Sequence, residues 1–157
     1  MTPAGIEPLA FLLGTWRGTV DVVYPTMEPA TFTEEMVFED GGAGEEFPFI
    51  AYRERAWTES TGLTEHAERG FWRVDSSTVD ATLSHPIAVG ELSEGSVDGT
   101  TVTLASSQIV VATTGLPVVG LERRYEVDGD RMIYVVNMQT PETALTLHLT
   151  GSLTRSA

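Results

Sequence analysis

The sequence predicts an all-β protein, a closed ten-stranded antiparallel up-and-down barrel with a short helix at its N-terminal end. Three observations carry this prediction. From Thr15 onward the chain is a series of β-rich runs, turn residues separate the runs at intervals of roughly 8 to 12 residues, and no long helical segment lies between them. Parallel pairing would need such helical crossovers, so consecutive runs are expected to pair as a meander. Closure into a barrel then removes the two open edges of the meander.

The individual elements follow in order along the chain. Pro8–Leu13 is an apolar run ahead of Gly14 and is typical of two helical turns that end at a glycine. Ten or eleven strand candidates follow it: Thr15–Tyr24, Thr31–Phe38, Phe47–Trp57, Glu65–Val74, Thr78–Ser84, Gly90–Val97, Thr101–Ser106, Ile109–Thr113, Leu121–Val127, Arg131–Gln139 and Thr143–Arg155. Asp98-Gly99 and Asp128-Gly129 supply the positive-φ residues of tight hairpins. We expect residues 1–157 to form one domain.

The composition excludes several classes of function. The chain contains no cysteine, which excludes disulfides, thiolate catalysis and cysteine-ligated metals. All nine basic residues are arginine, which excludes Schiff-base chemistry on lysine, and the formal net charge of −14 disfavours nucleic acid and anionic lipid as partners. The apolar runs are shorter than the roughly 20 residues that cross a bilayer, and no secretory signal is apparent. We therefore expect a cytoplasmic protein without membrane contact, and the sequence leaves a homodimer open.

His148 lies in the last predicted strand, where polar and apolar residues alternate. Period-two geometry places four leucines on one face and the more polar residues, His148 among them, on the other; the leucines are Leu145, Leu147, Leu149 and Leu153. The usual arrangement would turn the leucines to the core and His148 to water. In the alternative, small Thr and Ser side chains leave room for a planar ligand beside His148, and the leucines pack outside. Periodicity alone leaves both open.

The other two histidines, His66 and His85, are each explained by a structural role. His66 and Glu68 form an H-x-E pair on one strand face that could bind a metal, but the neighbouring Arg69 and Arg73 favour ion pairing instead. His85 precedes a proline at a strand end and is expected to be a turn residue, or to border the mouth of a cavity. The chain has no G-x-S-x-G, P-loop or G-x-G-x-x-G motif, so hydrolase, kinase and dehydrogenase functions lack support.

Several segments together resemble the nitrobindin family. Leu13–Val20, with Gly14, Trp16, Gly18 and Val20 at the motif positions, is similar to the family signature G-x-W-x-G-x-G, and Tyr24–Met27 is similar to the Y-P-T-I that follows it. The resemblance continues in order through four further segments and covers nearly the whole chain: Phe32–Phe38, His66–Arg73, Arg123–Asp130 and His148–Arg155. It implies a barrel of the calycin type, in which the signature tryptophan plugs one end.

The resemblance also implies a cofactor and an activity. In that family the histidine that matches His148 is the proximal ligand of ferric heme b, and the iron binds nitric oxide and isomerises peroxynitrite to nitrate. Val37 matches the apolar distal side as a candidate heme contact. Two positions depart from the pattern: Val20 replaces the third signature glycine, and Leu116 stands where the family has a lysine close to a heme propionate. The alternative functions are a non-catalytic carrier of a fatty acid or other small hydrophobic ligand, and a ligand-free interaction module.

Overall fold

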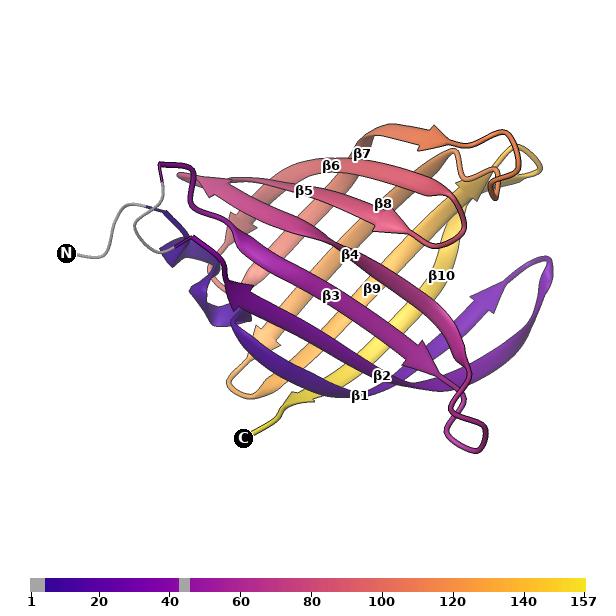
Figure 1. Ribbon diagram of the computed structural model, residues 1–157, viewed down its shortest axis with the longest axis horizontal. Coiled ribbons are helices and arrows are strands. Elements are labelled where there is room, and N and C mark those ends of the chain that lie inside the picture. The colour runs from indigo at the N-terminus through magenta and orange to yellow at the C-terminus, as the bar shows by residue number, and fades with distance from the viewer. Residues whose placement is uncertain (1–4, 43–45) are drawn as a thin grey trace.

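A computed structural model describes residues 5–42 and 46–157 and confirms the predicted barrel (Figure 1). Ten antiparallel strands pair in chain order, and the first and last strands pair with each other to close the barrel. The elements are η1 (Glu7–Leu12), β1 (Gly14–Tyr24), β2 (Met27–Asp40), β3 (Ile50–Trp57), β4 (Thr64–Asp75), β5 (Thr78–His85), β6 (Val89–Asp98), β7 (Thr101–Val111), β8 (Gly120–Asp128), β9 (Arg131–Thr140) and β10 (Thr143–Arg155).

Two elements differ from the prediction. The N-terminal helix is a 3-10 helix, and the two candidates Thr101–Ser106 and Ile109–Thr113 form the single strand β7. The register of β7 against β6 shifts by one residue between Ser106 and Gln108, and this bulge explains why β7 was predicted as two strands. Both predicted hairpin glycines, Gly99 and Gly129, have φ +58°. Among the described residues no helix is long and apolar enough to cross a membrane.

One end of the barrel is closed by η1 (Figure 1), against which the side chain of Trp16 packs. Leu9 and Leu12 of η1 are fully buried, and so is the indole of Trp16, whose Nε1 donates a hydrogen bond to the Leu12 carbonyl at 2.8 Å. The Arg155 guanidinium covers the indole, 4.1 Å from the ring centre. Trp16 therefore ties the 3-10 helix to the seam between the first and last strands.

Two other signature positions also contribute to the seam. A Cβ on Gly18 would lie 2.0 Å from the Ser152 carbonyl oxygen, so only glycine allows β1 to approach β10 this closely. Val20 is buried in the core and pairs with Gly151, where a Cβ would collide with the Tyr134 ring. The missing side chain at Gly151 leaves room for that ring beside Val20, so valine is accommodated at the position where the family signature has glycine.

We expect Trp16→Ala to lower the free energy of unfolding by about 3 to 5 kcal/mol, because it empties a fully buried aromatic site. Urea unfolding followed by circular dichroism measures the change. Trp57→Ala is the matched control, since Trp57 is only partly buried and should cost clearly less. Equal losses in the two variants would show that Trp16 does not plug the barrel.

Candidate functional site

A cavity of about 200 Å³ opens at the barrel end opposite η1. Its apolar wall consists of Val89, Val118, Leu121, Val136, Met138 and Leu149. Three more apolar side chains line it and are 40 to 48% exposed: Met27, Ile87 and Leu116. Large exposed hydrophobic side chains around a cavity are typical of a ligand-binding surface.

A β-bulge turns His148 toward this cavity. In the pairing of β10 with β9, Leu147 lies opposite Asn137 and Leu149 lies opposite Val136, which leaves His148 as the extra residue. Both His148 and Leu149 line the cavity as a result. Strict alternation is therefore wrong for this strand, and neither expected arrangement of the leucines holds throughout.

The leucines divide between the two faces of β10. Leu149 and Leu153 are buried in the core, whereas Leu145 and Leu147 are exposed. Ser152, which the alternative arrangement placed in the cavity, is exposed. The leucines alternate with period two on each side of the bulge. The extra residue at His148 reverses the alternation, so the leucines before it face outward and those after it face the core.

The imidazole of His148 has the surroundings of a neutral ligand. Its Nδ1 lies 3.3 Å from the Val23 carbonyl oxygen, and the Tyr24 ring packs edge-on at 5.3 Å between ring centres. Burial lowers the pKa of His148 below its usual value, which favours the uncharged ring. Among the described residues no protein group bonds to Nε2. Donation of the Nδ1 proton to a carbonyl leaves the Nε2 lone pair available.

Of the two other residues predicted to contact the cofactor, one lines the cavity and the other does not. Leu116 lines the cavity and is 48% exposed, in agreement with an edge position. Val37 does not line it: its side chain is buried, but its neighbours Met36 and Phe38 belong to the core cluster and Val37 does not, so period two turns Val37 to the outer face of β2. This placement does not support a contact between Val37 and a ligand in the cavity.

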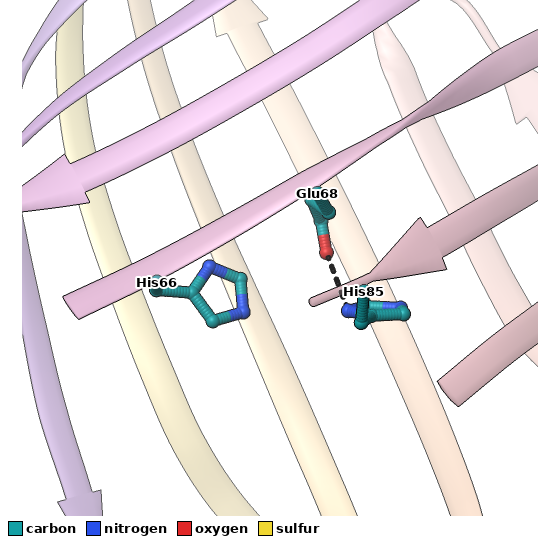
Figure 2. A group of neighbouring side chains, drawn as sticks. All are labelled: His66, Glu68 and His85. Carbon is teal, nitrogen blue, oxygen red and sulfur yellow. Dashed lines mark ion pairs between the residues drawn. The ribbon is translucent and has the colours of Figure 1, made fainter. Parts of the chain in front are cut away.

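Three polar side chains, His66, Glu68 and His85, form the inner wall of the cavity (Figure 2). His85 is buried and points inward from the end of β5, so its description as a turn residue was wrong, although it does border the cavity. The expected ion pairing of the H-x-E pair with Arg69 and Arg73 was also wrong. Arg73 pairs with Asp80 on the outer surface, and the partner of Glu68 is Arg123.

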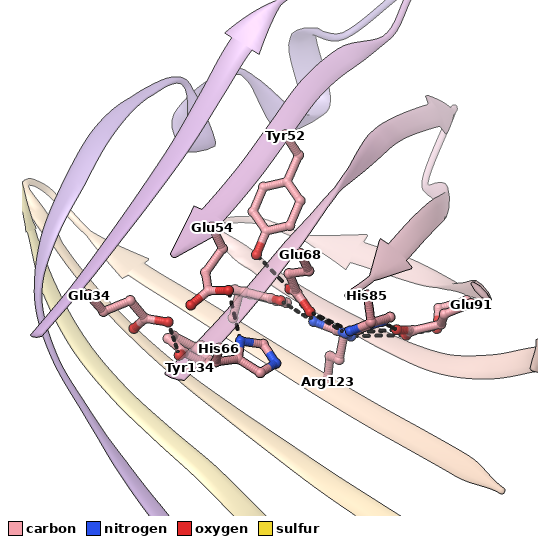
Figure 3. Close-up of polar contacts among 11 residues, drawn as sticks. Glu34, Tyr52, Glu54, His66, Glu68, His85, Glu91, Arg123 and Tyr134 are labelled. Carbon is pink, nitrogen blue, oxygen red and sulfur yellow. Dashed lines mark hydrogen bonds and ion pairs between the residues drawn. The ribbon is translucent and has the colours of Figure 1, made fainter. Parts of the chain in front are cut away.

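Arg123 is the centre of a buried ionic network beneath the cavity (Figure 3). Its Nη1 and Nη2 donate to the two oxygens of Glu68 at 2.8 and 2.9 Å, and its Nε and Nη2 donate to those of Glu91 at 2.9 and 2.7 Å. Burial alone would raise the pKa of Glu68, but the Arg123 charge outweighs it and lowers that pKa to about 2. The pKa of Glu91 is lowered by the same charge, again against the effect of burial.

A second part of the network contains two carboxyl groups close to each other. Tyr134 donates to Glu34 at 2.5 Å, and Nδ1 of His66 lies 2.8 Å from Glu54. Burial raises the pKa of Glu34 well above its usual value, and the charge of Glu54 raises it further. Oε2 of Glu34 and Oε1 of Glu54 are buried without a partner among the described residues. A proton retained on Glu34 satisfies this arrangement, because only a protonated carboxyl can donate to another.

Below the network the barrel is filled with aromatic rings. Phe38, Tyr52, Trp72, Tyr125 and Tyr134 are all buried and form a chain of ring contacts, with centres 4.9 to 5.8 Å apart. Tyr52 and Tyr125 connect these rings to the ionic network: the Tyr52 hydroxyl donates to Glu68 at 2.7 Å, and Arg123 donates to the Tyr125 hydroxyl at 3.2 Å. The cavity therefore ends at a charged floor and does not continue through the barrel.

Sequence reasoning missed most of this network. The signal was present in the strand alternation, since Glu54 lies between the inward residues Tyr52 and Ala56, and Arg123 lies between Leu121 and Tyr125. A charged residue at an inward position of a strand is either paired or functional.

The chain is similar to known proteins in both sequence and fold. A family profile described as a THAP4-like, heme-binding beta-barrel domain matches residues 5–155. Peroxynitrite isomerase 2 of Mycobacterium bovis (strain BCG / Pasteur 1173P2) is 33% identical over 99% of this chain and 96% of its own length. Peroxynitrite isomerase 2 of Mycobacterium avium (strain 104) is 33% identical over 98% of each chain. The crystal structure of Rv2717c from M. tuberculosis has a TM-score of 0.87 and 32% identity, and the match covers 100% of this chain and 99% of that one.

We expect Arg123→Met to lower the free energy of unfolding by about 3 to 5 kcal/mol at neutral pH, because two buried carboxylates lose their counter-ion. Arg124→Met is the control on the same strand. Arg124 is half exposed and pairs with Glu126, so its loss should cost no more than about 1 kcal/mol. Chemical denaturation of both variants tests the difference, and similar losses would contradict the role given to Arg123.

The ion pair between Glu68 and Arg123 makes the stability of the fold depend on pH. Since the pKa of Glu68 falls from 4.5 to about 2 on folding, its stabilising contribution is fully present above about pH 4.5 and is lost as the pH falls toward 2. Without the Arg123 charge this pKa depression disappears. Between these two pH values, the free energy of unfolding should therefore change less with pH in Arg123→Met than in the wild type. In Arg124→Met it should change with pH as in the wild type.

Proposed function

Because the chain belongs to the THAP4-like family of heme-binding β-barrel domains, we propose that it binds heme b in the cavity, with His148 as the axial ligand of the iron. The observation that carries this proposal is the orientation of His148. The bulge in β10 directs its neutral imidazole to the cavity, and the Val23 carbonyl holds Nδ1. A backbone carbonyl behind a ligating imidazole is the usual support of a metal-bound histidine.

The rest of the cavity fits a planar, largely apolar group. Ligand sites usually enclose about 300 to 1,000 Å³, so a cavity of about 200 Å³ would hold only part of a heme. The remainder of the macrocycle would cover the exposed apolar side chains of Met27, Ile87 and Leu116. Burial of these side chains contributes roughly 25 cal/mol for each Å² of apolar surface removed from water.

We propose that the activity is isomerisation of peroxynitrite to nitrate, as the names of the mycobacterial relatives indicate for those proteins. When bound, heme would supply the iron chemistry toward nitric oxide or peroxynitrite, and His148 would hold the iron. Peroxynitrite and nitrate have the same atoms and charge, so the reaction needs no further oxidant or reductant. The chain itself fixes the iron through His148 and keeps water from one part of the macrocycle with the apolar wall.

The alternative function, transport of a fatty acid, has less support. A long acyl chain would need an apolar channel into the barrel, but the cavity ends at Glu68, His85 and Arg123. Insertion of a hydrocarbon against this floor would remove charged groups from any remaining water without offering them a partner. A short, flat ligand at the open end avoids that cost.

His148→Ala should abolish the spectrum of a histidine-ligated ferric heme and weaken hemin binding by at least about tenfold, while the barrel stays folded. Hemin titration followed by absorption in the Soret region measures both effects. Thr150→Ala, two residues away and on the outward side of β10, is the control and should bind like wild type. Unchanged affinity and spectrum in His148→Ala would assign the axial ligand to another residue.

Leu116→Lys should tighten hemin binding, because a cation at this half-exposed position can pair with a heme carboxylate. Solvent screening limits the gain to about 1 kcal/mol, or about fivefold, and the gain should shrink at high salt. Val110→Lys adds the same charge on an exposed residue that does not line the cavity, and should leave the affinity unchanged. Equal affinities for all three proteins at low salt would place Leu116 away from the carboxylates.

A further inference from the structure

We propose that His66, Glu68 and His85 form a binding site for one divalent transition-metal ion of the zinc type at the inner wall of the cavity. The three residues come from the facing ends of β4 and β5, and each offers one ligand atom to the same space (Figure 2). These three atoms lie within 4.8 Å of one another. The site does not involve His148 and does not rest on the proposed heme function.

The strongest support is the way both imidazoles are held. Nδ1 of His66 lies 2.8 Å from Glu54, and Nε2 of His85 lies 2.9 Å from Glu91. Both carboxylates are buried. Each ring therefore has one nitrogen fixed by a buried carboxylate. Among the described residues the other nitrogen of His66 has no hydrogen-bond partner, and that of His85 faces only Glu68, which is itself one of the three proposed ligands. A carboxylate behind each ligating histidine is the common second layer of zinc sites, where it fixes the ring orientation and strengthens the ligand.

Glu68 can bind the metal ion and keep its hydrogen bonds to Tyr52 and Arg123. Its Oε1 already accepts from Tyr52 and Arg123, whereas its Oε2 accepts one bond, from Arg123. Since a carboxylate oxygen has two lone pairs, Oε2 retains one. Nδ1 of His85 lies 3.5 Å from this Oε2, a separation too long for a hydrogen bond and suitable for two atoms that share a metal.

The charges around the site favour a divalent ion. Glu54, Glu68 and Glu91 surround it with three carboxylates, and Arg123 is the only permanent positive charge among the described residues of the network. When a metal ion takes the place of the imidazole protons, the three carboxylates and Arg123 leave two negative charges in a buried region. A divalent cation cancels them, and Arg123 reduces the attraction but leaves its sign unchanged.

The ligand set indicates which ion fits. Two imidazoles and one carboxylate occur in catalytic zinc sites and in non-heme iron sites, and oxygen-preferring ions such as Ca²⁺ and Mg²⁺ are poor matches for imidazole. Three protein ligands leave at least one coordination position open toward the cavity. A small molecule in the cavity could therefore reach the ion directly.

The experiment uses the full chain produced without heme and freed of metal ions by chelation. Isothermal titration with Zn²⁺ at about pH 8, where imidazoles are mostly neutral, should show one site per chain. Visible absorption of added Co²⁺ should show the bands of nitrogen and oxygen ligation. His66→Gln should lower the Zn²⁺ affinity at least about tenfold, since it removes one ligand while its amide can still donate to Glu54.

Two further variants separate this site from the heme site and from surface binding. His148→Ala should keep wild-type Zn²⁺ affinity, because His148 is not a ligand of this ion. His85→Gln should lose affinity like His66→Gln, and a thermal melt shows whether it folds; His66, which is partly exposed, provides the test that does not depend on the core. No specific Zn²⁺ uptake by wild type, or uptake that His66→Gln leaves unchanged, would overturn the proposal. Loss of Zn²⁺ binding in His148→Ala would overturn the independence of the two sites.

Discussion

The guanidinium of Arg123, shared between Glu68 and Glu91, is the interaction on which the rest of the interior depends. A planar fork with five donors can bind two carboxylates at once, and here it connects three strands, β4, β6 and β8, across the barrel. Without this cation both carboxylates would remain buried without a counter-ion, and this would strongly lower the stability of the fold. The bond also fixes the depth of the cavity, because aromatic rings fill the space on one side of it and the ligand space lies on the other.

This division explains how one small barrel can be both stable and hollow. The end closed by η1 and Trp16 contains most of the large buried rings, whereas the wall of the open end consists of smaller aliphatic side chains of the same core cluster. His148 lies at the open end, on a bulge that interrupts the alternation of β10 but leaves Leu149 and Leu153 in the core. The strand thus supplies core residues and a cavity histidine within a few positions, which regular pleating could not do.

The sequence predicted the fold well because its signals were local. Turn residues such as Asp128-Gly129 and the period-two runs between them determine strands and hairpins without reference to distant residues. The site was harder to predict, because a bulge and a network depend on pairs that are far apart in the chain. The residues next to His148 in the sequence do not indicate that it lacks a partner in the pairing of β10 with β9. Arg123 and Glu68 are 55 residues apart in the chain. The resemblance to nitrobindins supplied His148, and it could not supply the charged floor.

The charged floor also bears on how this chain would hold a dianionic heme. Arg123 is the one arginine that lines the cavity among the described residues, and its donors are already engaged by Glu68, Glu91 and Tyr125. It therefore has nothing to offer the heme carboxylates, and Leu116 offers no charge in place of the family's lysine. The net charge of −14 adds a further repulsion that salt would screen. On the proposed function, heme affinity in this chain would come from ligation by His148 and from apolar contact at the mouth, without a paired cation for the carboxylates.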